Sequence, residues 1–300
     1  MRLSPRGFIG ATLGLGPLLS LTSCGPTVLI PHGPIGFADR LILFDSLAIM
    51  MAIVVPTIGA GLLFAFWFRA TNPRARYRPH FVYSGRLELV VWGIPTLVIL
   101  FLAGLIWIGA HRLDPAEPIA TNAGPLDIQV VALDWKWLFI YPDQGVAAVN
   151  DLVVPAGVPL HFSITSATVM NVFFVPQLGS MIYAMNGMMT QLHLLAANTG
   201  DYYGQSSQFS GDGFSGMHFT LHAVAPEAFS NWVNATRGAG PVLDRAAYDG
   251  LLKQSLNVKP YTYRAIDPRL FEAIVTQHVP PGEGPQVGRP SPDVHPVSED

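Results

Sequence analysis

The chain has 300 residues, of which half are hydrophobic and 12% are charged, and its formal net charge is -3. Ordinary soluble domains contain roughly 25% charged residues, so this composition indicates a membrane-anchored protein. The small net charge argues against a nucleic-acid surface. Because Cys24 is the single cysteine, the sequence excludes an internal disulfide framework, an iron–sulfur cluster, a C-x-x-C-H haem attachment and a Cys-based zinc site.

Residues 1–23 have the pattern of a secretory signal peptide. Arg2 and Arg6 supply a positive start, an apolar run follows, and Leu-Thr-Ser-Cys at 21–24 closes the segment. This tetrad resembles a bacterial lipobox, which implies cleavage before Cys24 and attachment of lipid, with acyl chains such as palmitate, to its sulfur. The alternative is an uncleaved first membrane helix in which Cys24 is incidental.

Two apolar stretches, at 41–68 and 87–110, predict a pair of transmembrane helices. Each is longer than the ~20 residues that cross a bilayer core of about 30 Å. The connector at 69–86 contains five arginines and no acidic residue, so the positive-inside rule places it in the cytoplasm. Residues 24–40 and the chain after His111 are then expected on the exported side, as the lipobox requires.

The composition changes after a proline-rich linker at 111–125. Between 126 and 236, short runs rich in β-branched and aromatic residues alternate with Gly, Pro and Asn, which predicts an all-β sandwich or barrel. The expected strands are 126–133, 135–141, 152–154, 160–165, 169–175, 189–195 and 217–224. A helix is expected to begin at Pro226. Residues 237–278 show two weak helical patterns, and the Pro- and Gly-rich tail at 279–300 is predicted to be disordered.

Two membrane helices followed by an exported β-sandwich resemble subunit II of the haem–copper terminal oxidases, whose sandwich is a cupredoxin. In the cytochrome c oxidase branch, the resemblance implies a loop of pattern C-x-x-x-C-x-x-x-H-x-x-M. Together with a Glu between the cysteines and a His from an earlier strand, that loop holds a dinuclear copper centre through two bridging thiolates. The segment at 203–218 has the shape of this loop without its ligands.

The aligned pattern identifies six positions that form a vacated copper site. They are Asn171 at the earlier His, Ser206 and Ser210 at the thiolates, Gln208 at the Glu, Phe214 at the loop His and Met217 at the Met. Of these side chains, Met217 alone retains a copper ligand, and a lone thioether does not hold the metal. The interpretation predicts no dinuclear copper centre and no electron entry from cytochrome c.

Loss of this centre with the sandwich retained resembles the quinol oxidase branch, and specifically the cytochrome bo-type ubiquinol oxidases. Segments 134–142, 169–171, 182–185 and 213–217 carry the resemblance. It implies a subunit of a proton-pumping complex of the bacterial inner membrane that oxidises ubiquinol and reduces oxygen to water. No cofactor is expected in this chain; haem and copper are expected in the partner subunit I. Smaller subunits and membrane lipid are further expected contacts.

Glu88 is predicted to take part in proton uptake. An acid at the start of a membrane helix can serve only the helix dipole, and the physical argument leaves that alternative open. In the oxidases that the chain resembles, an acid of subunit II at this place lies at the mouth of the K-type proton pathway of subunit I. The resemblance therefore assigns Glu88 to that entrance. Asp45 either pairs with a subunit I cation or reaches the membrane surface.

Several aromatic and histidine side chains have a plainer explanation than cofactor chemistry. Trp135 and Trp137 are expected in core and interface packing. His218 and His222 lie ~13 Å apart along a regular strand, so we expect surface or subunit-contact roles rather than one shared ion. A composite site of His161 and His193 with a neighbouring strand stays open.

Two other functions stay open at this point. One is a lipid-anchored copper-handling protein that uses Met217, His218 and His222 as ligands. The other is a purely structural tether with a cupredoxin-like fold and no oxidase partner.

Overall fold

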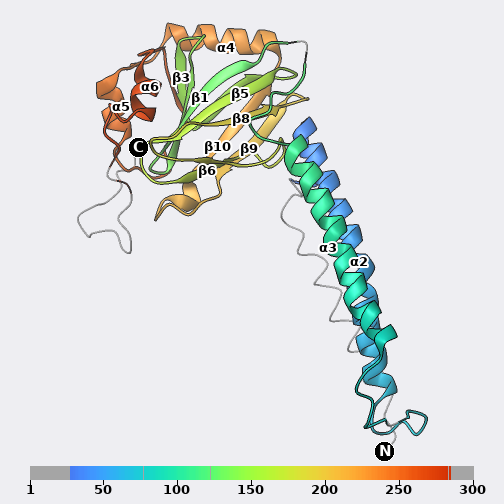
Figure 1. Ribbon diagram of the computed structural model, residues 1–300. Helices are drawn as coiled ribbons and strands as arrows, with labels where there is room; N and C mark the ends of the chain where they lie inside the picture. Colours follow the sequence, from blue (N-terminus) through green and yellow to red (C-terminus); the bar gives the residue numbers. More distant parts are fainter. Residues whose placement is uncertain (1–27, 77, 122, 283, 285–300) are drawn as a thin grey trace, which may run out of the picture.

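The computed structural model describes residues 28–76, 78–121, 123–282 and 284. A helical hairpin extends from one side of a β-sandwich, and a small C-terminal segment packs on the sandwich (Figure 1). This arrangement confirms the predicted fold class. The expected signal peptide at 1–23, the lipidation residue Cys24 and most of the tail at 279–300 lie outside the described residues.

The hairpin consists of α2 (Pro34–Trp67) and α3 (Gly85–Arg112). Both helices are long and apolar enough to cross a membrane, and the described residues leave the most apolar segment of each helix exposed. Each helix continues through an internal proline, Pro56 or Pro95. Helix α2 begins at Pro34, before the predicted segment at 41–68, because the apolar run marks the membrane part rather than the helix end and proline suits a first turn.

The exported end of the hairpin is joined directly to the sandwich. The backbone N–H of Gly36 donates to the carbonyl oxygen of Leu178 at 3.0 Å. A Cβ atom at Gly33 would lie 2.3 Å from the carbonyl oxygen of Leu195, so only glycine allows the two backbones to approach this closely.

The sandwich has two main sheets, with strand orders β12-β3-β2-β1-β5-β8 and β4-β10-β9-β6-β7. The first contains β1 (Leu126–Leu133), β2 (Lys136–Tyr141), β3 (Val146–Val149), β5 (Pro159–Ser166), β8 (Thr190–Leu195) and β12 (Tyr261–Tyr263). The second contains β4 (Asp151–Pro155), β6 (Asn171–Phe174), β7 (Ile182–Ala184), β9 (Gly200–Ser206) and β10 (His218–Val224).

All seven predicted strands are present, and helix α4 (Pro226–Gly238) begins at the predicted residue. Strands β3, β7, β9 and β12 were not predicted because they are short or rich in Gly and polar residues. The main core lies between the two sheets. Trp137, Phe173 and Phe219 meet there, with ring centroids 5.2 to 5.8 Å apart, and each is at most 1% exposed.

The C-terminal segment contains the predicted helices and also three short strands. Its elements are β11 (Val242–Leu243), α5 (Arg245–Leu251), β12, β13 (Ala265–Ile266) and α6 (Leu270–Val275). A second core forms where Tyr248 and Phe271 pack with Leu138 and Ile140 of β2. Strand β12 pairs antiparallel with β3, so this segment completes the first sheet.

Candidate functional site

The six predicted copper positions gather around the loop between β9 and β10. This loop contains a 3-10 helix (Phe214–Gly216) and lies on the side of the sandwich opposite α4 (Figure 1). The hydroxyl of Ser206 donates to Oδ1 of Asn171 at 3.1 Å and lies 3.4 Å from the carbonyl oxygen of Gln208. The backbone N–H of Ser206 donates to the carbonyl oxygen of Met217 at 3.1 Å. The structure therefore brings these four positions together.

The other two positions, Ser210 and Phe214, each contact an aromatic side chain. Ser210 is buried, and its carbonyl oxygen accepts a hydrogen bond from Nε1 of Trp135 at 3.1 Å. Its own hydroxyl has no hydrogen-bond partner among the described residues. Phe214 packs edge-on against Phe209, with ring centroids 5.6 Å apart. A hydroxyl and two aromatic rings thus occupy this part of the loop.

The side chains at these positions do not fit a dinuclear copper centre. Such a centre needs soft, negatively charged sulfur to share two copper ions, whereas Ser206 and Ser210 offer hydroxyls and Asn171 offers an amide already bonded to Ser206. The neighbouring Met217 is 2% exposed. Within the part of the chain that the structure describes, no group of three or more His, Cys, Asp and Glu could hold a metal ion.

The turn between β1 and β2 contacts the loop between β9 and β10 through Trp135. Trp135 adopts a left-handed backbone conformation with φ of 65°. Its ring packs against Gly213 of the loop, where a Cβ atom would lie only 2.3 Å from the ring. Trp135 is 4% exposed and Trp137 is fully buried. Both tryptophans therefore pack in the core, as predicted.

The same turn contains a buried acid, Asp134, and a buried lysine, Lys136, whose roles the sequence did not indicate. Asp134 accepts hydrogen bonds from Thr168 Oγ1 at 2.6 Å and from Gln254 Nε2 at 3.2 Å. The ammonium group of Lys136 donates to the carbonyl oxygen of Lys253 at 2.8 Å. Loss of solvation on burial raises the pKa of Asp134, and its hydrogen bonds and Lys136 oppose that shift. These contacts join the turn to the C-terminal segment.

The outer face of β10 carries the two histidines of the copper-handling alternative. His222 contacts Asp201 at 2.6 Å and Asp151 at 3.1 Å. Desolvation raises the pKa of Asp151, His222 lowers it and Asp201 raises it. His218 stacks on the ring of Tyr203. Met217 is instead buried toward the core, so the proposed copper ligands do not converge on one point.

His161 and His193 form a pair across β5 and β8. Their rings stack with centroids 4.7 Å apart at an angle of 17°, and Nδ1 of His161 lies 2.6 Å from Oδ1 of Asp127. Nearly parallel stacked rings do not aim their nitrogens at a shared ion. Ring stacking and the contact of His161 with Asp127 therefore explain these two histidines without a metal ion.

Glu88 lies in the first turn of α3, at the end of the hairpin away from the sandwich (Figure 1). Its side chain is exposed, and its backbone N–H donates to the carbonyl oxygen of Ser84 at 3.0 Å. Asp45 is exposed on α2. The structure therefore separates Glu88 from the six loop positions, so the chain has two distant candidate sites.

Two family models match the exported part of the chain. The model described as cytochrome c oxidase subunit II, periplasmic domain, matches residues 142–224, and the model described as COX aromatic rich motif matches residues 237–282. The second match covers the compact C-terminal segment, where the sequence predicts only two weak helices. The aromatic residues at 248, 261, 263 and 271 were the available signal.

Curated relatives match across both the hairpin and the sandwich. Ubiquinol oxidase subunit 2 of Acetobacter aceti is 45% identical over 267 residues, covering 88% of this chain and 87% of the relative. Cytochrome bo(3) ubiquinol oxidase subunit 2 of Pseudomonas aeruginosa is 43% identical and covers 89% and 80%. Its counterpart from Pseudomonas putida is 42% identical and covers 92% and 87%.

Proposed function

The chain belongs to the ubiquinol oxidase subunit 2 family, and we propose that it is the non-redox subunit II of a proton-pumping ubiquinol oxidase. One observation carries the non-redox part of the proposal. The loop positions that would need thiolates hold Ser206, bonded to Asn171, and the buried Ser210. Neither position therefore offers a thiolate ligand for copper.

In this proposal the chemistry belongs to the partner subunit I, which holds haem and copper. Ubiquinol is the electron donor of the complex, oxygen is the acceptor, and cytochrome c is not a substrate. This chain supports assembly through its hairpin and its exported domain, with smaller subunits as further partners. The exposed apolar side chains of α2 and α3 support packing against lipid and subunit I.

The proposed topology places the sandwich in the periplasm of a bacterium and both helices in its inner membrane. The signal peptide at 1–23 is removed, and Cys24 carries lipid. The connector at 69–86, with its five arginines, lies in the cytoplasm. Glu88 then stands at the cytoplasmic end of α3, where it forms one side of the K-type proton entrance of subunit I.

Metal and substrate analysis of the purified complex tests the non-redox assignment. The complex should oxidise ubiquinol, fail to oxidise reduced cytochrome c, and contain only the copper of subunit I. Copper in the exported sandwich, or electron transfer from cytochrome c through it, would contradict the proposal.

A gain-of-function variant tests the vacated copper site directly. The combined changes Asn171→His, Ser206→Cys, Gln208→Glu, Ser210→Cys and Phe214→His should give the complex additional copper with the absorption of a thiolate-bridged pair. The matched control carries the same changes except those at Ser206 and Ser210 and should bind no additional copper. A folded variant that binds none would count against this interpretation of the loop.

A further inference from the structure

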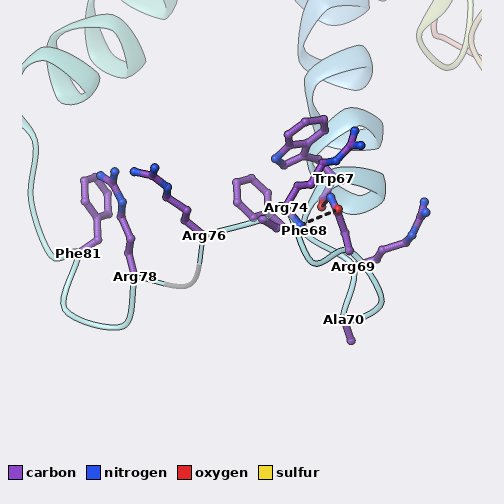
Figure 2. Close-up of a pocket in the computed structure, with 10 residues that line it drawn as sticks. Trp67, Phe68, Arg69, Ala70, Arg74, Arg76, Arg78 and Phe81 are labelled. Atoms are coloured by element: carbon purple, nitrogen blue, oxygen red, sulfur yellow. Dashed lines mark hydrogen bonds between the residues drawn. The ribbon is translucent and has the colours of Figure 1, made fainter.

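The connector between the two membrane helices forms a pocket at the end of the hairpin away from the sandwich. Its volume is about 860 Å³, and ten residues between Trp67 and Phe81 line it (Figure 2). This volume lies within the ~300–1,000 Å³ range of small-molecule sites. Four of the lining residues are arginines, namely Arg69, Arg74, Arg76 and Arg78.

The positive charge of this pocket is not balanced within the described part of the chain. The connector at 69–86 has no acidic residue. Arg69 donates to Thr71 Oγ1 at 3.1 Å and lies over the ring of Phe66 at 4.1 Å. The guanidinium groups of Arg74, Arg76 and Arg78 take part in none of the side-chain hydrogen bonds or ion pairs between described residues. Three guanidinium groups therefore remain available for an anion.

The pocket also has an apolar wall. Trp67, Phe68 and Phe81 are 46%, 59% and 57% exposed. Figure 2 shows Phe81, Arg76 and Arg78 extending from the loop in the direction of the helices. Aromatic side chains at a helix end are typical of the boundary between hydrocarbon and headgroups, and long arginine stems reach along that boundary. The pocket therefore presents cationic and apolar groups to the same layer of the membrane.

We infer that this pocket binds the phosphate headgroup of an anionic phospholipid. Guanidinium groups bind phosphate oxygens in paired, charge-assisted hydrogen bonds, and the aromatic wall supplies a surface for the first methylenes of the acyl chains. A free phosphate ion would use the arginines and leave the aromatic wall without a partner. The positive-inside rule accounts for the charge of the loop but not for its combination with a pocket. The inference needs the hairpin in a membrane and does not need the oxidase activity.

Lipid titration of the delipidated, purified complex in detergent tests this inference. Native mass spectrometry would measure binding of phosphatidylglycerol, phosphatidylcholine of the same chain length and glycerol phosphate. A hydrogen bond to a charged group contributes roughly tenfold or more to binding, so the triple variant Arg74→Gln, Arg76→Gln, Arg78→Gln should bind phosphatidylglycerol at least about a hundredfold more weakly. The matched triple variant Arg112→Gln, Arg264→Gln, Arg269→Gln removes the same charge from the exported side and should bind it as the unmodified complex does.

Phosphatidylcholine tests whether the site requires an anionic lipid, and glycerol phosphate tests whether a soluble phosphate is sufficient. Equal occupancy by phosphatidylcholine, or displacement of phosphatidylglycerol by glycerol phosphate, would overturn the assignment to an anionic lipid. Unchanged phosphatidylglycerol binding in the glutamine variant would overturn the site itself. Should that variant fail to insert, the variant Arg74→Lys, Arg76→Lys, Arg78→Lys keeps the charge that orients the hairpin. It should retain the preference for phosphatidylglycerol over phosphatidylcholine, and loss of that preference in the inserted lysine variant would contradict a charge-based site.

Discussion

The hairpin and the sandwich both contain large apolar side chains, but the hairpin exposes them and the sandwich buries them. In α3, Trp92 is 74% exposed and Trp107 is 68% exposed, whereas Trp137 in β2 is fully buried. The sandwich provides its own apolar interior through the stacked rings of Phe173 and Phe219. The hairpin exposes its apolar side chains, which lipid and a partner subunit cover in the proposed complex. The apolar core that stabilises the exported domain therefore lies within that domain, whereas the apolar side chains of the hairpin are free to contact other molecules.

The largest expected effect on stability comes from replacing a buried tryptophan of the sandwich by alanine, compared with the same change at an exposed tryptophan of the hairpin. Trp137→Ala removes a buried ring that packs edge-on against Phe173 and Phe219, so it should lower the free energy of unfolding of the exported domain by about 3–5 kcal/mol. Trp92→Ala should leave that value unchanged. Near-ultraviolet circular dichroism of the purified complex during heating would measure both. Equal losses in the two variants would break the comparison.

A change in the hairpin should alter turnover without altering the sandwich. Glu88→Gln removes the carboxylate at the proposed proton entrance, so we expect ubiquinol oxidation to slow by about tenfold, equivalent to roughly 1.4 kcal/mol in the barrier. Reduction of the haem–copper site should slow while ubiquinol still binds. Glu117→Gln, at an exposed carboxylate in the linker after α3, is the matched control and should retain activity. Unchanged reduction kinetics in the Glu88 variant would remove this assignment.

The two serines at the thiolate positions should differ from each other. Ser206→Ala leaves Oδ1 of Asn171 without its donor, so it should destabilise the exported domain by about 1 kcal/mol. Ser210→Ala removes a buried hydroxyl with no partner among the described residues and should be neutral or slightly stabilising. Thermal unfolding of both variants compares them. A larger loss at Ser210 would show that its hydroxyl has a partner in the assembled complex.

The smallest expected effect is a change in pH dependence. Burial raises the pKa of Asp134 above its ordinary value of 3.8. The folded state therefore holds this proton more tightly than the unfolded state, and the stability from Asp134 is present below pH 3.8 and is lost as the pH rises through the folded pKa. Asp134→Asn should flatten the melting temperature of the exported domain across that window. Asp212→Asn, at an exposed carboxylate, is the control and should leave the slope unchanged.

The sequence was a good guide to the strands that alternate apolar and polar residues. In β5, Leu160, Phe162 and Ile164 are fully buried and alternate with polar residues, which is the pattern of a half-buried strand. Strand β9 escaped prediction because it contains Gly204, where the ring of Phe219 occupies the space that a Cβ would need, 2.1 Å away. A glycine that a sheet requires for packing has no strand signal in the sequence.

The candidate site was predictable only where a family pattern aligned its residues. That pattern placed Asn171 and Ser206 together, and their hydrogen bond agrees with it. The contact between Asp134 and Gln254 joins residues 120 positions apart, so no local pattern indicates it. The pocket of the connector was also not predicted, because its shape depends on how the loop folds back toward the two helices.

Because β12 pairs with β3, the first sheet is completed only after the C-terminal segment has been exported. Until Tyr261–Tyr263 has crossed the membrane, β3 forms the border of its sheet and its outward-facing backbone groups lack their partner strand. Unpaired strands of this kind add readily to other chains. The exported domain therefore passes through a stage at which nearly the whole chain has been delivered but one border of the sheet is still open. A chain that stops before residue 261 remains permanently at that stage.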